Sequence, residues 1–205
     1  MCKICNNITI KKVINKLSYD FCPYCGFLSK DESYYLDSEN EFKRYLEHNN
    51  NDNIGYISYQ EKFYIEIEKF LGNDVLDYGC GDNHVLANII KKNNKNVFYY
   101  DLYFYPDESF KKHFYDAIIL EEVIEHIADP LTLLKYLMKL LKKDGKLIIR
   151  TMFIPRDVFD KNWWYLRDST HISFFDLKTF EYICKLLSMS IIYCNDKDLI
   201  ILQKV

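Results

Sequence analysis

Features that mark several classes of protein are missing from this sequence of 205 residues. Its formal net charge is only −3, so no strong overall field attracts a polyanion, and nucleic acid is disfavoured as a substrate. The longest apolar runs have the length of a strand, and the opening residues Met-Cys-Lys-Ile-Cys do not lead from a charged segment into an apolar one. We therefore expect no membrane span, no signal peptide and a cytoplasmic protein.

Seven cysteines are present, and without an export signal we expect thiols or metal ligands rather than disulfides. Four of them form two Cys-x-x-Cys pairs, Cys2 with Cys5 and Cys22 with Cys25. Four thiolates favour zinc, and the sixteen residues between the pairs match a zinc ribbon. The pattern predicts a structural zinc site, against the alternative of a frayed terminus with redox-sensitive thiols. The remaining three are expected to be small core residues: Cys80, Cys184 and Cys194.

Glycine is scarce, yet two of the six glycines lie in one turn that follows an apolar run. Gly79 and Gly81 allow a tight turn in which the backbone comes close to a ligand, and helical spacing begins three residues later. A second apolar run ends about twenty residues on in Asp101, placed to accept hydrogen bonds from a ribose. The order of strand, glycine turn, helix and strand predicts a nucleotide-like cofactor, whereas the alternative is a plain turn with a loop-capping aspartate.

These residues resemble the S-adenosylmethionine-dependent methyltransferases of the Rossmann-like class. In that family the first strand ends in an acidic residue followed by Gly-x-Gly, as Asp77 to Gly81 do here. Residues 116–130 resemble the fourth strand and its loop, and a helix at 130–143, a turn at 143–145 and a strand at 146–151 continue the pattern. The resemblance covers about residues 60–205.

The end of the chain supplies a topological clue. The apolar runs 190–194 and 199–202 are joined by four residues, too few for a parallel crossover, so they must form a hairpin. An antiparallel last strand is typical of the resembled family. The expected fold is therefore α/β and Rossmann-like, with a mostly parallel sheet, an antiparallel C-terminal hairpin and a small N-terminal zinc ribbon, while the short interval 101–116 leaves little room for a full helix and third strand.

With 49% hydrophobic residues and no evident repeat, the chain can bury one substantial core and carry a small appendage. We expect a zinc-ribbon-like segment at 1–30, a linker or lid at 31–58, and the methyltransferase domain at 59–205. The resemblance implies S-adenosyl-L-methionine as cofactor, bound by Asp77, Gly79, Cys80, Gly81, Asp101 and Glu121. Residues ahead of the first helix often cover the cofactor in relatives, which implies Tyr45, His48 and Asn49, although surface positions without ligand contact are an equal alternative.

The loop around residues 163–175 leaves the sheet edge where ligands of parallel sheets bind. We expect Asp168 and His171 to orient one another, with neutral His171 removing a proton from the attacking nucleophile, or else to form a structural latch. Glu122 is a third catalytic candidate, and Glu125 with His126 is expected to anchor its loop. A sulfonium methyl donor is already activated, so alignment and desolvation promote transfer without a catalytic metal.

The leading function is a methyltransferase that transfers a methyl group to a small-molecule acceptor by direct displacement. One alternative is an RNA or protein methyltransferase in which the ribbon recognises the substrate, and it predicts salt-sensitive binding to RNA. The other is a non-catalytic binding module that retains the cofactor fold. The acceptor atom, whether oxygen, nitrogen or carbon, is left open by the sequence.

Overall fold

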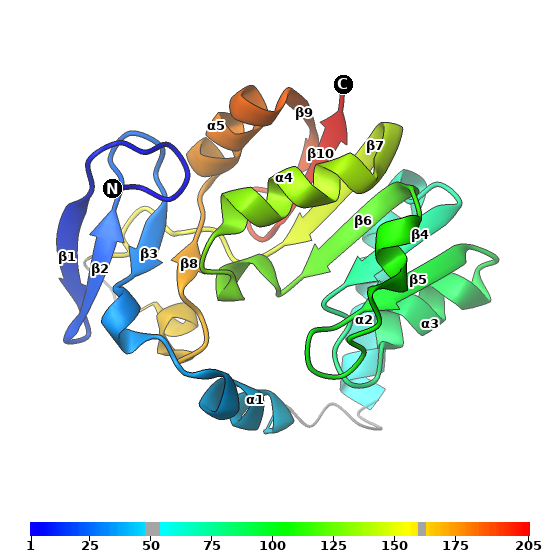
Figure 1. Cartoon of the computed structure of the whole chain (residues 1–205), viewed down its shortest axis with the longest axis horizontal. Coiled ribbons are helices and arrows are strands. Elements are labelled where there is room, and N and C mark those ends of the chain that lie inside the picture. The colour runs from blue at the N-terminus through cyan, green and yellow to red at the C-terminus, as the bar shows by residue number, and fades with distance from the viewer. Residues whose placement is uncertain (48–53, 160–162) are drawn as a thin grey trace.

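The computed structural model describes residues 1–47, 54–159 and 163–205, whose strands form two sheets (Figure 1). The larger sheet has the strand order β5-β4-β6-β7-β10-β9. Its strands are β4 (Asp74–Tyr78), β5 (Asn96–Tyr100), β6 (Tyr115–Glu121), β7 (Leu141–Arg150), β9 (Met189–Cys194) and β10 (Leu199–Lys204). The first four of these pair in parallel, whereas β10 is antiparallel to both of its neighbours. The predicted α/β fold with a mostly parallel sheet and an antiparallel terminal hairpin is confirmed.

Four helices cover the two faces of the large sheet: α2 (Ile54–Ile67), α3 (Val85–Lys92), α4 (Pro130–Leu140) and α5 (Leu177–Leu187). Side chains of β6 alternate between the faces, so Ile119 packs with α2 and α3 while Ile118 packs with α4 and α5. Both sides of the central strands are therefore buried, which is why these strands read as continuous apolar runs. The layers hold the carboxyl ends of the strands rigidly in place.

Helices α4 and α5, which cover the same face of the large sheet, each begin at a strong capping signal. Asp129 accepts the backbone N–H of Thr132 and is followed by proline at the first helical position of α4. Asp176 and Thr179 form a reciprocal capping box at the start of α5. These local signals fix where each helix leaves the loops that line the carboxyl edge of the sheet.

The smaller sheet joins the first thirty residues to the second half of the chain. Its order is β1-β2-β3-β8, formed by β1 (Ile10–Ile14), β2 (Leu17–Phe21), β3 (Leu28–Lys30) and β8 (Ser173–Phe174). Leu28 pairs with Phe174 and Ser29 pairs with Ser173. The segment expected as a separate ribbon is thus continued by a strand of the larger domain, and the expected linker, 31–58, contains helix α1 (Ser38–Leu46) and the start of α2.

Two predicted boundaries are wrong. The helix expected over 130–143 ends at Leu140, because Leu141 already pairs with Tyr115 as part of β7. The turn expected at 143–145 lies in a bulge of that strand, where the pairing with β6 passes from Leu141 to Lys146 and Asp144 has a φ of 57°. The helix expected to begin near residue 59 begins at Ile54.

As expected, the interval after β5 is short: it holds a 3-10 helix, Glu108–Lys112, before β6.

None of the helices in the described ranges is both long and apolar enough to cross a membrane.

Candidate active site

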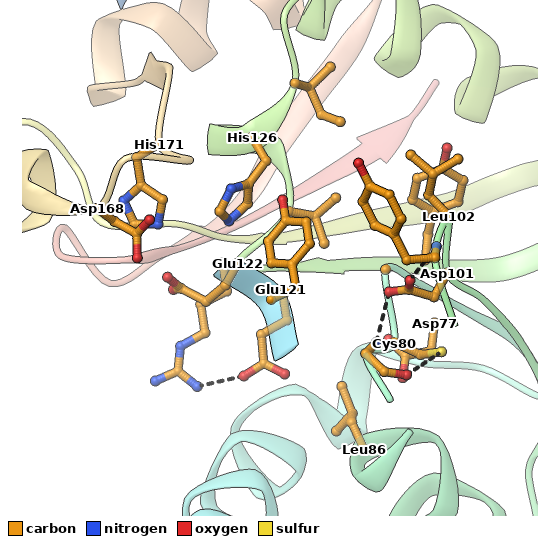
Figure 2. A pocket seen from close by; sticks show the side chains of 18 of the residues that line it. Asp77, Cys80, Leu86, Asp101, Leu102, Glu121, Glu122, His126, Asp168 and His171 are labelled. Atoms are coloured by element: carbon orange, nitrogen blue, oxygen red, sulfur yellow. Dashed lines mark hydrogen bonds and ion pairs between the residues drawn. The ribbon is translucent and has the colours of Figure 1, made fainter. Parts of the chain in front are cut away.

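A cavity of about 1070 Å³ opens at the carboxyl ends of β4, β5, β6 and β7, where ligands of parallel sheets bind. Most of the predicted site residues line it: Tyr45, Asp77, Gly79, Cys80, Gly81, Asp101, Glu121, Glu122, Asp168 and His171. In Figure 2, Asp77 and Asp101 lie at one end, and Asp168 and His171 lie at the other. We call these the glycine end and the histidine end. His48 and Asn49 lie outside the described residues.

The turn after β4 has a backbone that favours glycine. Gly79 has a φ of 85°, and a Cβ atom there would lie 2.3 Å from Cγ2 of Val123. Gly81 has a φ of 69°, but a Cβ atom there would meet no atom within 4 Å. Gly79 is therefore enclosed by packing, whereas Gly81 borders open space through which a ligand can approach the backbone.

Asp101 holds this turn from the end of the neighbouring strand. Its Oδ2 accepts the backbone N–H of Gly81 at 3.0 Å, and its Oδ1 accepts those of Tyr103 and Phe104 at 2.9 and 3.1 Å. Each carboxylate oxygen accepts about two hydrogen bonds, so the group retains capacity for ligand hydroxyls. The carboxylate thus fixes the turn and is positioned beside the cavity.

Two carboxyl groups with raised pKa values lie along the sheet edge. Burial raises the pKa of Asp77 to about 7 and the pKa of Glu121 to about 8. The side-chain Oδ2 of Asp77 has no hydrogen-bond partner among the described residues, although only 3% of the residue is exposed. Glu121 instead pairs with the Arg150 guanidinium at 3.4 Å, and a dashed line ends at the labelled Glu121 in Figure 2. A ligand that brings a positive charge or a hydrogen-bond donor would satisfy the buried Oδ2 of Asp77.

Helix α1 closes one side of the cavity. Arg44 pairs with Asp168 at 2.8 Å, and the Tyr103 hydroxyl donates to Glu41 at 2.6 Å. The Tyr45 ring packs 5.5 Å from the rings of both Tyr103 and His126. The helix therefore bridges the loop after β5 and the loop before β8, so it reaches from the glycine end to the histidine end.

Asp168 and His171 lie beside each other at the histidine end (Figure 2). Although burial opposes ionisation of Asp168, hydrogen bonds from Thr170, the charge of His171 and the Arg44 contact hold its pKa below the usual value. His171 is 8% exposed, and its Nδ1 lies 2.9 Å from the carbonyl oxygen of Tyr165. The arrangement keeps Asp168 ionised and fixes the imidazole ring.

A buried tyrosine connects two glutamates at the same end. The Tyr165 hydroxyl hydrogen bonds to Glu125 and lies 2.9 Å from a carboxylate oxygen of Glu122. Burial raises the pKa of Glu122, and burial together with the neighbouring Glu122 charge raises the pKa of Glu125 well above its usual value. One hydroxyl proton cannot serve two carboxylates at once, so the three groups share protons as a unit.

Comparison with known proteins identifies the family of this chain. A family model described as a methyltransferase domain matches residues 39–187. The chain belongs to this methyltransferase family. A search of curated proteins found no match to this methyltransferase.

Two solved structures share the fold of this methyltransferase. An O-methyltransferase family protein from Burkholderia thailandensis has a TM-score of 0.51 at 12% identity, and the match covers 80% of this chain but only 62% of that one. Magnesium protoporphyrin IX methyltransferase from Synechocystis, solved with bound S-adenosylmethionine, has a TM-score of 0.52 at 13% identity, over 84% of this chain and 94% of that one. At these identities the likeness shows the fold alone.

The four N-terminal cysteines of this methyltransferase lie together, apart from the cavity. Their sulfur atoms are all within 4.8 Å of one another, with 3.5 Å between Cys2 and Cys25 and 3.4 Å between Cys5 and Cys22. Four sulfurs around a tetrahedral zinc ion with bonds of about 2.3 Å stand roughly 3.8 Å apart. The spacing in this cluster is therefore close to that of a zinc site. Of the other three cysteines, Cys184 is buried, whereas Cys80 and Cys194 are half-buried.

Several residues that line the cavity were not predicted from the sequence. Arg150, at the carboxyl end of β7, ion-pairs with Glu121 and Asp198, and its guanidinium lies 4.4 Å from the Tyr59 ring centre. Its position after an apolar strand was the available signal. Tyr165 lies in the loop around residues 163–175 but was not among the predicted site residues. Of the two tryptophans beside it, Trp163 packs in the core of the small sheet and Trp164 is 58% exposed at the cavity.

Proposed function

We propose that this methyltransferase uses S-adenosyl-L-methionine and transfers its methyl group to a small-molecule acceptor by direct displacement. The observation that carries the proposal is the buried Oδ2 of Asp77, which has no hydrogen-bond partner in the described part of the chain. It lines the same cavity as the open face of Gly81 and the Asp101 carboxylate. The donor molecule combines a positive charge with ribose hydroxyls. The positive charge matches the buried carboxyl group of Asp77, and the ribose hydroxyls match the Asp101 carboxylate after β5, which can accept their hydrogen bonds.

The cofactor supplies an activated methyl group, so the protein has to bind, align and desolvate the reactants. Gly79, Cys80 and Gly81 provide the close backbone approach, Asp101 binds the ribose, and the carboxylates Asp77 and Glu121 favour the cationic end. Tyr45, on α1, covers the donor and excludes water. The fold shared with the Synechocystis enzyme, solved with S-adenosylmethionine, supports the choice of this cofactor.

The acceptor is proposed to lie at the histidine end, next to the donor. Glu122, Asp168 and His171 line this end and are proposed to bind the acceptor, orient it and remove its proton. Helix α1 encloses the cavity through its contacts with Asp168 and Tyr103, which favours a small molecule over a folded macromolecule. The small net charge of −3 agrees with this choice.

The four-cysteine cluster is proposed to hold a structural zinc ion. Cys22 and Cys25 are fully buried, Cys2 nearly so, and a set of four thiolates leaves no coordination position for a substrate. The ion would stabilise the small sheet, whose strand β8 continues from the loop that carries His171.

The experiment for the acceptor is methyl transfer from labelled S-adenosyl-L-methionine into fractionated cell extract. We expect the label in the low-molecular-mass fraction, in amounts that rise with enzyme. Label confined to RNA or to protein would contradict the small-molecule proposal, and cofactor binding without label in any fraction would indicate a binding module.

Replacing Asp77 with asparagine is expected to stabilise the cofactor-free protein at pH 8 while weakening cofactor binding about tenfold or more. A carboxyl group with a folded pKa of about 7, above the unfolded value of about 4, costs stability progressively as pH rises from 4 to 7. Asparagine removes that cost, on the order of 4 kcal/mol for a difference of about three pKa units, but also removes the negative charge that attracts the donor.

Thermal melts of wild type and Asp77→Asn at pH 5 and pH 8 measure the effect on stability, and titration calorimetry measures the affinity. The difference in stability should shrink at pH 5, where the native carboxyl group is protonated. Taking the difference between the two proteins removes the contribution of groups that Asp77 does not influence, whereas the pKa of Glu121, which the Asp77 charge raises, falls in the variant and adds to the gain in stability. Equal or tighter cofactor binding by the variant would contradict the role given to Asp77.

A further inference from the structure

A second group of metal-ligand side chains exists in the described part of the chain, besides the cysteine cluster. It consists of Glu125, His126 and His171, each offering one ligand atom, and these atoms lie within 4.8 Å of one another. Two of the residues follow β6 and the third precedes β8, so the fold brings them together from distant parts of the sequence. From the sequence, Glu125 and His126 were expected only to anchor a loop.

Both imidazole rings are oriented by backbone carbonyl groups. Nδ1 of His126 lies 3.1 Å from the carbonyl oxygen of Thr170, and Nδ1 of His171 lies 2.9 Å from that of Tyr165. A carbonyl oxygen only accepts, so each Nδ1 carries the proton and donates it. In the neutral rings the lone pair is therefore on Nε2, the form that binds metal ions. Histidine ligands in metal sites usually have such a second hydrogen bond.

Glu125 supplies an independent observation. The residue is fully buried, and one carboxylate oxygen accepts a hydrogen bond from the Tyr165 hydroxyl. The other oxygen, Oε2, has no hydrogen-bond partner among the residues that the structure describes. Leaving a buried carboxylate oxygen unsatisfied costs free energy, and a cation beside it would remove that cost.

We propose that Glu125, His126 and His171 bind a divalent cation of the zinc class at the histidine end of the cavity. Two imidazoles and one carboxylate form the donor set of catalytic zinc and non-haem iron sites, which keep further coordination positions open. Both histidines line the cavity, so an open position would face the space assigned to the acceptor. This site differs in kind from the closed cluster of four thiolates.

The role of this ion in the reaction rests on the proposed function, and it selects an acceptor with a hydroxyl group. Coordination of the hydroxyl oxygen lowers its pKa, the O–H bond breaks and the proton passes to the Glu122 carboxylate, because His171 cannot act as the base while its Nε2 holds the ion. The oxygen's electron pair then forms the bond to the methyl carbon. As it forms, the carbon–sulfur bond breaks and its electron pair returns to sulfur, which converts the sulfonium donor into the neutral thioether S-adenosylhomocysteine.

The test measures the metal content of the full-length protein without donor or acceptor. The protein is stripped of metal under reducing conditions, reloaded with Zn²⁺, desalted and analysed by atomic emission. We expect two equivalents in the wild type, one in His126→Ala and one in Glu125→Gln, which keeps the side-chain volume. His113→Ala is the matched control, because this exposed histidine lies outside both groups, and it should retain two equivalents.

A cobalt titration of the wild type keeps the test independent of how the variants fold. Co²⁺ bound by thiolates has intense sulfur-to-metal charge-transfer absorption, whereas Co²⁺ bound by nitrogen and oxygen does not. We expect a second equivalent of Co²⁺ to bind after the thiolate absorption has saturated. A wild type that binds Co²⁺ only with thiolate absorption would overturn the proposal, and so would a folded His126→Ala variant that keeps the metal content of the wild type. Because no cofactor is present, this outcome is separate from failure of S-adenosylmethionine binding.

Discussion

Removing the proposed zinc ion from the four-cysteine cluster is expected to lower the melting temperature by on the order of 10 °C or more. Structural zinc sites contribute about 10–16 kcal/mol of apparent binding free energy in isolated peptides, and this free energy becomes folding free energy. Without the ion, the small sheet would be stabilised mainly by pairing of short strands, since β1 and β2 have five residues each and β3 has three. Chelation under reducing conditions followed by calorimetry measures the change.

Cys22→Ser tests the same claim by mutation, because Cys22 is fully buried in the cluster. Cys194→Ser is the matched control, since this half-buried cysteine lies outside the cluster. The melting temperature of the Cys194→Ser variant should stay within about 2 °C of the wild type. Equal stability of Cys22→Ser and the control, with no zinc in either wild type or variant, would contradict the structural zinc site.

The loss of zinc should affect the two ends of the cavity differently. The backbone N–H of Lys30 donates to Ile172 at 2.8 Å, and the backbone N–H of Ile172 donates to Glu125 at 2.8 Å. The small sheet therefore supports the loop that carries His171, whereas the glycine turn is held by the large sheet. We expect methyl transfer to fall more than cofactor affinity in the zinc-depleted protein.

Gly79→Ala is expected to abolish measurable cofactor binding and to lower stability by about 2–4 kcal/mol. The new Cβ atom would lie 2.3 Å from Val123, a contact that must be relieved by moving the turn or the loop after β6. A φ of 85° adds strain for any residue with a side chain. For a chain of this size, such a loss lowers the melting temperature by roughly 5–15 °C.

Gly81→Ala provides the matched comparison. Its φ of 69° carries a similar backbone cost of about 1–2 kcal/mol, but its Cβ atom would meet no protein atom within 4 Å. We expect a smaller loss of stability than in Gly79→Ala, together with cofactor binding weakened at least tenfold, because the methyl group would occupy the space of the ligand. Normal cofactor affinity in Gly81→Ala would contradict the approach of the cofactor along this face of the turn.

The fold was largely predictable because its signals are local. The glycine turn, the apolar runs and the four-residue connection before the last strand are each read within about ten residues, and together they fix the parallel sheet and its antiparallel hairpin. The boundary between α4 and β7 was missed because pairing of Leu141 with Tyr115 depends on a strand more than twenty residues earlier. Local helix propensity gives no sign of that pairing.

The site was predictable where residues follow strand ends and unpredictable where loops meet. Asp101 was predicted from its position after β5, and Asp77 and Glu121 were predicted from the family resemblance; all three line the cavity. The contact of Glu125 and His126 with His171 depends on how the loop after β6 packs on the loop before β8. No spacing in the sequence records that packing, so the group was visible only in three dimensions.

The most direct test of the account is titration calorimetry of S-adenosyl-L-methionine into the purified wild-type protein, with Asp101→Ala as the comparison. We predict one binding site per chain with a micromolar dissociation constant, and a loss of at least tenfold in the variant, because Asp101 both holds the N–H of Gly81 and faces the proposed ribose position. A folded wild-type protein that produces no binding heat, and whose melting temperature does not rise with the cofactor, would contradict the central claim.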